Sequence, residues 1–167
     1  PTTMPDVKVL VIQSNGSYED STTPLQLNLA LPQLETLKII DVPFSRITLN
    51  KKLTPKLQDL ELQSIGDGPK VDILLPSLKT LSVYHVGGSW VKKMLKAATQ
   101  LERLDCYKCG IGRDMVLASN ALRYVSLHRS DCLRSITLYA PPLEYLSLQA
   151  CYDLEKLQFQ DKHPKLT

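Results

Sequence analysis

The chain has 167 residues, a formal net charge of +3 and a hydrophobic fraction of 43%. This length and composition are those of one folded domain and exclude a disordered or fibrous chain. The charge is mild and no basic stripe with interleaved aromatic residues is present, which argues against nucleic-acid binding. No run of 18 apolar residues occurs, so the sequence predicts no membrane insertion.

A short pattern recurs along the chain. In PSLKTLSVYHV, residues 76–86, apolar residues stand two, five, seven and ten positions after the first residue. We call these positions offsets 2, 5, 7 and 10. The pattern starts at Pro5, Pro32, Pro55, Pro76, Thr99, Asn120, Pro141 and Pro164. The steps between successive starts are therefore 27, 23, 21, 23, 21, 21 and 23 residues.

This spacing resembles that of the leucine-rich repeat family, whose repeats of 20–29 residues carry the motif L-x-x-L-x-L-x-x-N/C. The resemblance covers essentially the whole chain and implies a solenoid with a parallel concave sheet. It implies no single activity, because such folds serve many functions. We expect residues 1–167 to form a single leucine-rich repeat domain. Both ends cut a repeat, so we expect a fragment of a longer array.

Each repeat is predicted to hold one strand at offsets 3–9. Neighbours along a strand alternate between faces, so offsets 4, 6 and 8 point outward when the apolar offsets point inward. A second apolar pair, two residues apart, follows later in most repeats and predicts short strands on the return side. These pairs are Leu27/Leu29, Ile47/Leu49, Val71/Ile73, Met115/Leu117, Ile136/Leu138 and Leu157/Phe159. The expected fold is thus mostly β.

One repeat departs from the pattern after Gly87-Gly88. The segment SWVKKMLKAAT places its apolar residues on one helical face and its lysines on the other. It predicts one helix near residues 90–98, with Ser89 as the N-cap. Trp90 is expected to fill the core beneath this helix.

The four cysteines invite a chemical interpretation. Cys106-x-x-Cys109 could be half of a zinc site or a redox pair, but the two residues occupy inward offsets 7 and 10. Cys151 also lies at offset 10, and no second pair of ligands is spaced for zinc. The sequence therefore predicts structural thiols, no metal and no cofactor. Unpaired thiols without a signal peptide favour an intracellular location.

Asn15 begins a glycosylation sequon, Asn15-Gly16-Ser17. Because Asn15 lies at offset 10, it is predicted to cap a turn. No catalytic motif occurs, and the histidines lie in different repeats away from the inward cysteines. We therefore expect no enzymatic activity.

Tyrosines gather at the outward offsets of the C-terminal repeats. The predicted partner-binding residues are Tyr84, Arg103, Tyr107, Tyr124, His128 and Tyr145. Contact surfaces are enriched in Tyr and Arg, and solenoids bind partners on their concave wall. The sequence therefore favours a non-catalytic protein–protein interaction module. Three alternatives remain open: a sheet face stabilised only by cross-strand aromatic pairs, a glycan-binding tyrosine ladder, and a structural spacer.

Overall fold

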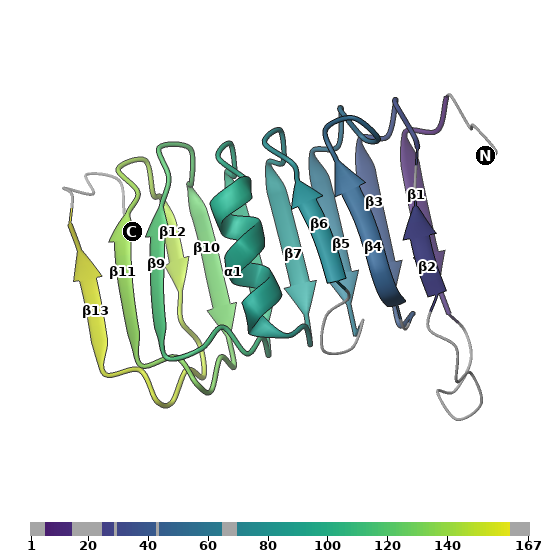
Figure 1. The fold of residues 1–167 in the computed structure, drawn as a ribbon. Helices are drawn as coiled ribbons and strands as arrows, with labels where there is room; N and C mark the ends of the chain where they lie inside the picture. The colour runs from purple at the N-terminus through teal and green to yellow at the C-terminus, as the bar shows by residue number, and fades with distance from the viewer. Residues whose placement is uncertain (1–5, 15–24, 29, 43, 65–69, 161–167) are drawn as a thin grey trace.

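The computed structural model describes residues 6–14, 25–28, 30–42, 44–64 and 70–160. These residues form a mostly β solenoid of parallel strands with one helix among them (Figure 1). Predictions that concern Asn15, Leu29 and the repeat start at Pro164 lie outside the described residues. No described helix is long and apolar enough to span a membrane.

Seven parallel strands form the predicted concave wall. In spatial order they are β1 (Val9–Gln13), β3 (Thr36–Ile40), β5 (Asp59–Gln63), β7 (Thr80–Tyr84), β8 (Arg103–Tyr107), β10 (Tyr124–His128) and β12 (Tyr145–Ser147). Every strand begins at offset 4, and equal offsets lie side by side, as Leu81 lies beside Leu104. The repeat spacing therefore sets the register of the whole sheet.

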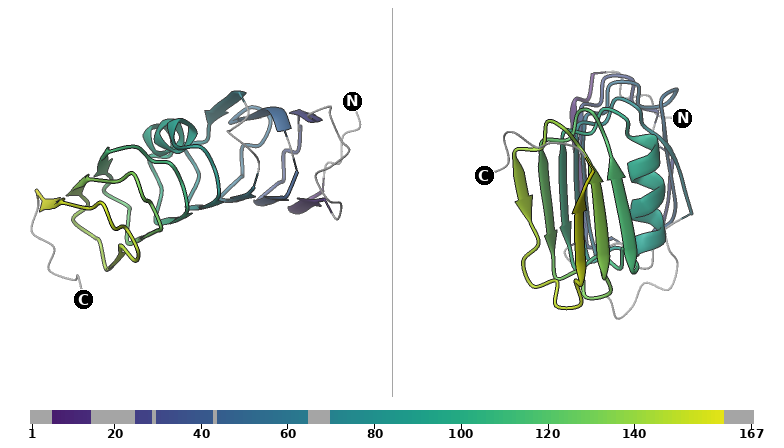
Figure 2. Two further views of the ribbon diagram at one scale, coloured as in Figure 1. Left: turned by 90° about the horizontal axis from the view of Figure 1, so that it is seen from below. Right: turned by 90° about the vertical axis from the view of Figure 1, so that its left-hand side faces the viewer.

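The return wall consists of two three-stranded parallel sheets, which face the long sheet across the core (Figure 2). One contains β2 (Leu25–Asn28), β4 (Phe44–Asn50) and β6 (Lys70–Leu74). The other contains β9 (Asp114–Ala118), β11 (Ser135–Tyr139) and β13 (Lys156–Phe159). The predicted apolar pairs are register neighbours, since Ile136 lies beside Met115 and Leu157 lies beside Ile136. The prediction of short return strands is confirmed.

Helix α1 (Gly88–Ala97) lies between these two sheets, where a further return strand would otherwise stand (Figure 1). The helix was predicted at residues 90–98, and its start differs. Gly87 is the N-cap residue and makes no side-chain cap bond, so the prediction that Ser89 caps the helix is wrong. Trp90 and Val91 are both buried, and a helix that turns them inward in its first turn must begin before them.

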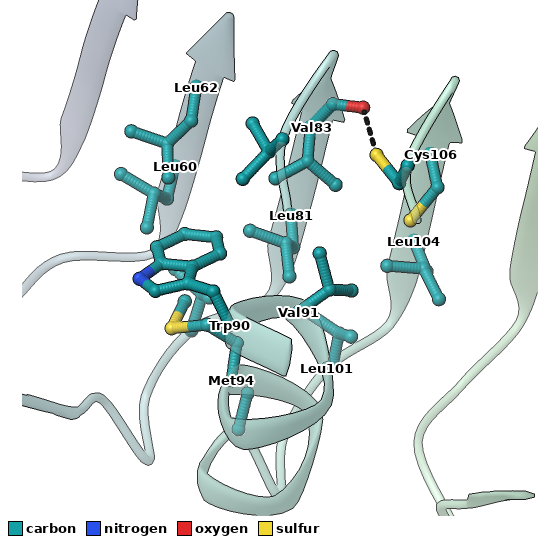
Figure 3. Close-up of a cluster of buried hydrophobic side chains, with 14 of the residues drawn as sticks. Leu60, Leu62, Leu81, Val83, Trp90, Val91, Met94, Leu101, Leu104 and Cys106 are labelled. Carbon is teal, nitrogen blue, oxygen red and sulfur yellow. Dashed lines mark hydrogen bonds between the residues drawn. The ribbon is translucent and has the colours of Figure 1, made fainter. Parts of the chain in front are cut away.

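Leucine, isoleucine and valine at offsets 2, 5 and 7 fill the space between the walls and are almost all fully buried in the central repeats. Trp90, Val91 and Met94 of α1 pack onto this core from the return side (Figure 3). Trp90 is only 5% exposed, which confirms the prediction that it fills the core. Because the inward face is apolar, each repeat is held by burial against its two neighbours.

The residue at offset 9 adopts a left-handed backbone conformation in every described repeat from β3 onward. These residues are Asp41, Ser64, His85, Lys108, Arg129 and Ala150, with φ between 50° and 57°. The N–H of each of the first five donates to the offset-8 carbonyl of the next repeat, at 2.9–3.0 Å. The left-handed residue ends the strand and turns the following side chain inward, which explains why offset 10 is a core position.

This conformation costs a residue with a Cβ about 1–2 kcal/mol, and glycine avoids that cost. Replacing the exposed Lys108 by Gly is therefore expected to raise the free energy of unfolding by about 0.5–1 kcal/mol, after the larger chain entropy of glycine is subtracted. Lys108→Val should lower it by about 1 kcal/mol or more, because a β-branched residue fits this region poorly. Urea unfolding of the two variants gives both values, and equal stability of Gly and Val at this position would contradict the prediction.

Candidate binding surface

The six predicted binding residues lie on one face of four neighbouring strands, β7, β8, β10 and β12. Arg103 and Tyr145 are exposed, and the other four are half-buried. The structure divides them into two clusters. One lies where the strands begin, at offset 4, and the other lies where they end, at offset 8.

The first cluster is a continuous stack of three side chains. Arg103, Tyr124 and Tyr145 occupy the same register position on β8, β10 and β12. The guanidinium carbon of Arg103 lies 3.8 Å from the ring centroid of Tyr124. The rings of Tyr124 and Tyr145 are 4.4 Å apart at their centroids and within 5° of parallel. We call these three residues the Arg-Tyr-Tyr stack.

An ion pair fixes the outer end of the stack. Arg103 donates from Nη2 to Oδ2 of Asp105, two residues along β8, at 3.1 Å. The pair is partly exposed and its own stabilisation is small. It nevertheless limits the rotamers of Arg103 and leaves the guanidinium against the Tyr124 ring, where cation–π attraction is favourable.

The second cluster gathers around Tyr107. Tyr84 and Tyr107 are register neighbours, but the ring contact of Tyr107 is with His85, at 5.6 Å between centroids. The guanidinium of Arg129 lies 5.9 Å from the same ring. His128 shares a hydrogen bond of 3.2 Å between Nε2 and the hydroxyl of Ser147. The second cluster is therefore aromatic and basic, but looser than the stack.

Small or acidic side chains at offset 6 separate the two clusters: Ser82, Asp105, Ser126 and Ser147. Offsets 4 and 8 are four residues apart along a strand, so the two clusters lie about 13 Å apart in the strand direction. Burial of Tyr84, with smaller contributions from Asp105 and Glu61, raises the pKa of its phenol, so it remains a hydroxyl donor at neutral pH. Ser126 is buried although its offset points outward.

The sequence prediction did not include His85 and Arg129 in the binding set. Strict alternation along a strand would turn offset 9 away from the face that offset 8 occupies. The left-handed conformation at offset 9 breaks that alternation, and the side chains of His85 and Arg129 reach the Tyr107 ring. A signal was present, because offset 9 is polar or charged in five of the six repeats where it is left-handed.

The cysteines lie where the sequence predicted. Cys106, Cys109 and Cys151 are buried, Cys132 is exposed, and none forms a disulfide. The thiols at offset 10 donate to offset-7 carbonyls of the preceding repeat: Cys109 to Val83 at 3.3 Å and Cys151 to Leu127 at 3.0 Å. A hydrogen bond to Cys109 and burial together raise the pKa of the Cys106 thiol. Within the described ranges, no group of three or more His, Cys, Asp or Glu residues is arranged to hold a metal.

This arrangement predicts that a single thiol reacts in the native protein. With a chromogenic disulfide reagent at neutral pH, Cys132 should react at least about 100-fold faster than the three buried thiols, because the thiolate must be accessible to react. All four should react in denaturant. A Cys132→Ser variant should lose the fast phase, and a second fast thiol in that variant would contradict the burial of the other three.

Comparison with known proteins adds no relative: no family model, no curated protein and no solved structure matches this chain.

Proposed function

We propose that this chain is a leucine-rich repeat protein that binds a partner protein through the wall formed by β7, β8, β10 and β12. The repeat spacing and the parallel solenoid support the family assignment. The Arg-Tyr-Tyr stack carries the functional proposal, because it presents three contact-forming side chains in one fixed arrangement on an open sheet face. The proposed function has no catalytic step.

Preorganisation is the physical basis of this proposal. Binding costs about 0.5–1.5 kcal/mol for each side chain that must be immobilised. In the stack, Arg103 is held by Asp105 and Tyr124, and Tyr124 is held by Tyr145, so much of this cost is met before a partner arrives. Arginine and tyrosine are also the residue types that most often dominate interface energies.

The same geometry favours a protein over a glycan. A sugar ring stacks on the face of an aromatic ring, but both faces of Tyr124 are already covered, one by Arg103 and the other by Tyr145. Tyr145 is 42% exposed, and Tyr124 is its one ring partner among the described residues. The tyrosines therefore offer one stacking platform and a wide edge of hydroxyl groups, which suits hydrogen bonding to a polypeptide.

The test compares two double variants in a pull-down from a lysate of the cells that produce the protein. Tyr124→Ala with Tyr145→Ala removes the stack. Tyr152→Ala with Lys156→Ala removes two exposed side chains that lie in a turn and on the return strand β13, outside the wall. A partner on the predicted wall should be captured by the parent protein and the second variant and lost by the first.

An Arg103→Glu variant adds a quantitative check once the partner is purified. It should weaken binding at least tenfold, because it reverses the charge at the end of the stack and also repels Asp105. Equal capture by both double variants, with all proteins folded, would remove the wall as the binding surface. If the parent protein binds oligosaccharides on a glycan array and the first double variant does not, the glycan function would be favoured instead.

A further inference from the structure

A groove with a volume of about 800 Å³ runs along the return side between α1 and β9. Helix α1 packs against β6 on its other flank, so the groove lies on the β9 side of the helix. The floor of the groove is lined by the apolar residues Leu101, Met115, Leu117 and Leu122. Its rim on the helix side carries Lys92 and Lys96. The volume falls within the range of about 300–1,000 Å³ that is typical of ligand pockets.

Among the described strands, β9, which borders this groove, has a partner on one side only. β9 pairs with β11 on one side and is the last strand of its sheet on the other. Arg113 and Ser119 form main-chain hydrogen bonds with β11. In a parallel sheet every second residue of a strand bonds to the same neighbour, so the odd-numbered residues between them also face β11. The main-chain groups of Asp114, Val116 and Ala118 therefore face the groove. An open edge of this kind accepts added strands.

One main-chain carbonyl on this edge already accepts a hydrogen bond from a side chain outside the sheet. Lys92 of α1 donates from Nζ to the carbonyl of Asp114 at 2.9 Å. Lys96 follows one helical turn later, about 6 Å along the axis, and Val116 follows Asp114 by about 6.6 Å along the strand. Lys96 is thus level with Val116. Among the described residues, no carboxylate forms an ion pair with Lys96.

Charge and hydrogen-bonding pattern together define what would fit. The helix carries Lys92, Lys93 and Lys96, and it has no acidic residue in its first turn. The one acidic lining residue, Asp114, already accepts a hydrogen bond from Ser135 at 2.6 Å. The outer rim beyond Val116 includes Tyr139, and both side chains are exposed apolar groups. The groove therefore presents an unpaired main chain, an apolar floor and positive charge on the helical rim.

We propose that this groove binds an extended acidic peptide segment of a partner protein, which adds as a fourth strand to the edge of β9. Alternate side chains of the added strand point into the floor formed by Leu101 and Leu122. The intervening side chains point outward, where a glutamate or aspartate meets Lys96. Main-chain bonds to Val116 and Ala118 provide affinity, and the charge provides selectivity. This surface is separate from the wall of the proposed function.

The test uses a capped nine-residue peptide, Thr-Val-Glu-Val-Glu-Val-Glu-Val-Thr, and a twin with Lys in place of every Glu. By titration calorimetry the acidic peptide should bind and the basic twin should bind at least tenfold more weakly. Hydrogen exchange of the Val116 amide should slow at least tenfold when the acidic peptide is bound. Exchange at the Met115 amide, which β11 already protects, should not change.

Matched protein variants assign the contacts. Lys96→Glu should weaken binding of the acidic peptide at least tenfold. Lys93→Glu makes the same charge change outside the groove lining and should leave the affinity unchanged. Val116→Pro removes the edge N–H and leaves the bonds to β11 in place, as proline is tolerated on an edge. No binding of the acidic peptide at millimolar concentration, or equal weakening by both lysine variants, would overturn the proposal. A dimer of this chain that Val116→Pro dissociates would replace the peptide with a second copy.

Discussion

Replacing Leu104 by Ala is expected to lower the free energy of unfolding by about 3–5 kcal/mol, the upper part of the range for leucine truncation in a core. Leu104 is fully buried at the second residue of β8, and its register neighbours are Leu81 of β7 (Figure 3) and Val125 of β10. Strand backbones on both sides are held by a continuous ladder, so they cannot move inward to close the cavity. The lost contacts therefore remain lost.

Urea unfolding followed by circular dichroism measures this effect. Val116→Ala is the matched control, because it truncates a strand residue that is 63% exposed and should change stability by less than about 0.5 kcal/mol. A loss below about 1 kcal/mol for Leu104→Ala would mean that the neighbouring repeats relax into the cavity. A smaller denaturant slope would mean that the array has separated into two independently unfolding parts at β8, since each repeat contacts only its neighbours.

The sequence predicted the solenoid because one periodic signal encodes both walls. Offsets 2, 5 and 7 fix the inward face, and their constant spacing fixes the register between repeats. The return strands followed from the second apolar pair, which the pairing of Ile136 with Met115 confirms. Periodicity was sufficient to predict the two walls, because every row of apolar residues is buried together when equal offsets of successive repeats stack on one another.

Periodicity was insufficient where the backbone leaves the strand conformation. The left-handed residue at offset 9 is not marked by glycine, and it brings His85 and Arg129 to the Tyr107 ring. The helix start was displaced because capping preference named Ser89, whereas burial of Trp90 and Val91 requires an earlier first turn. The groove beside β9 also had no sequence signal, since it results from a helix replacing a strand between two sheets.

Replacement by serine should destabilise the protein far more at Cys106 of β8 than at Cys109 of the following turn. Cys106→Ser is expected to lower the free energy of unfolding by about 2 kcal/mol, because a hydroxyl at this fully buried position loses water without gaining a strong acceptor. Its side-chain hydrogen bond is with the sulfur of Cys109, a weak acceptor. Cys109→Ser should cost less than about 0.5 kcal/mol, because a hydroxyl can donate to the carbonyl of Val83 in place of the thiol.

Cys109→Ala completes this comparison. It should cost about 1–2 kcal/mol, since the Val83 carbonyl then loses a donor inside the core. In the same unfolding experiment, the Cys109→Ser variant should be more stable than the Cys109→Ala variant. At position 106 the Ala variant should be at least as stable as the Ser variant. The reverse order at position 109 would show that its sulfur acts only as apolar volume. The expected order would establish that the side chain of Cys109 bonds its turn to the preceding strand, which links offset 10 of this repeat to the stacking of the solenoid.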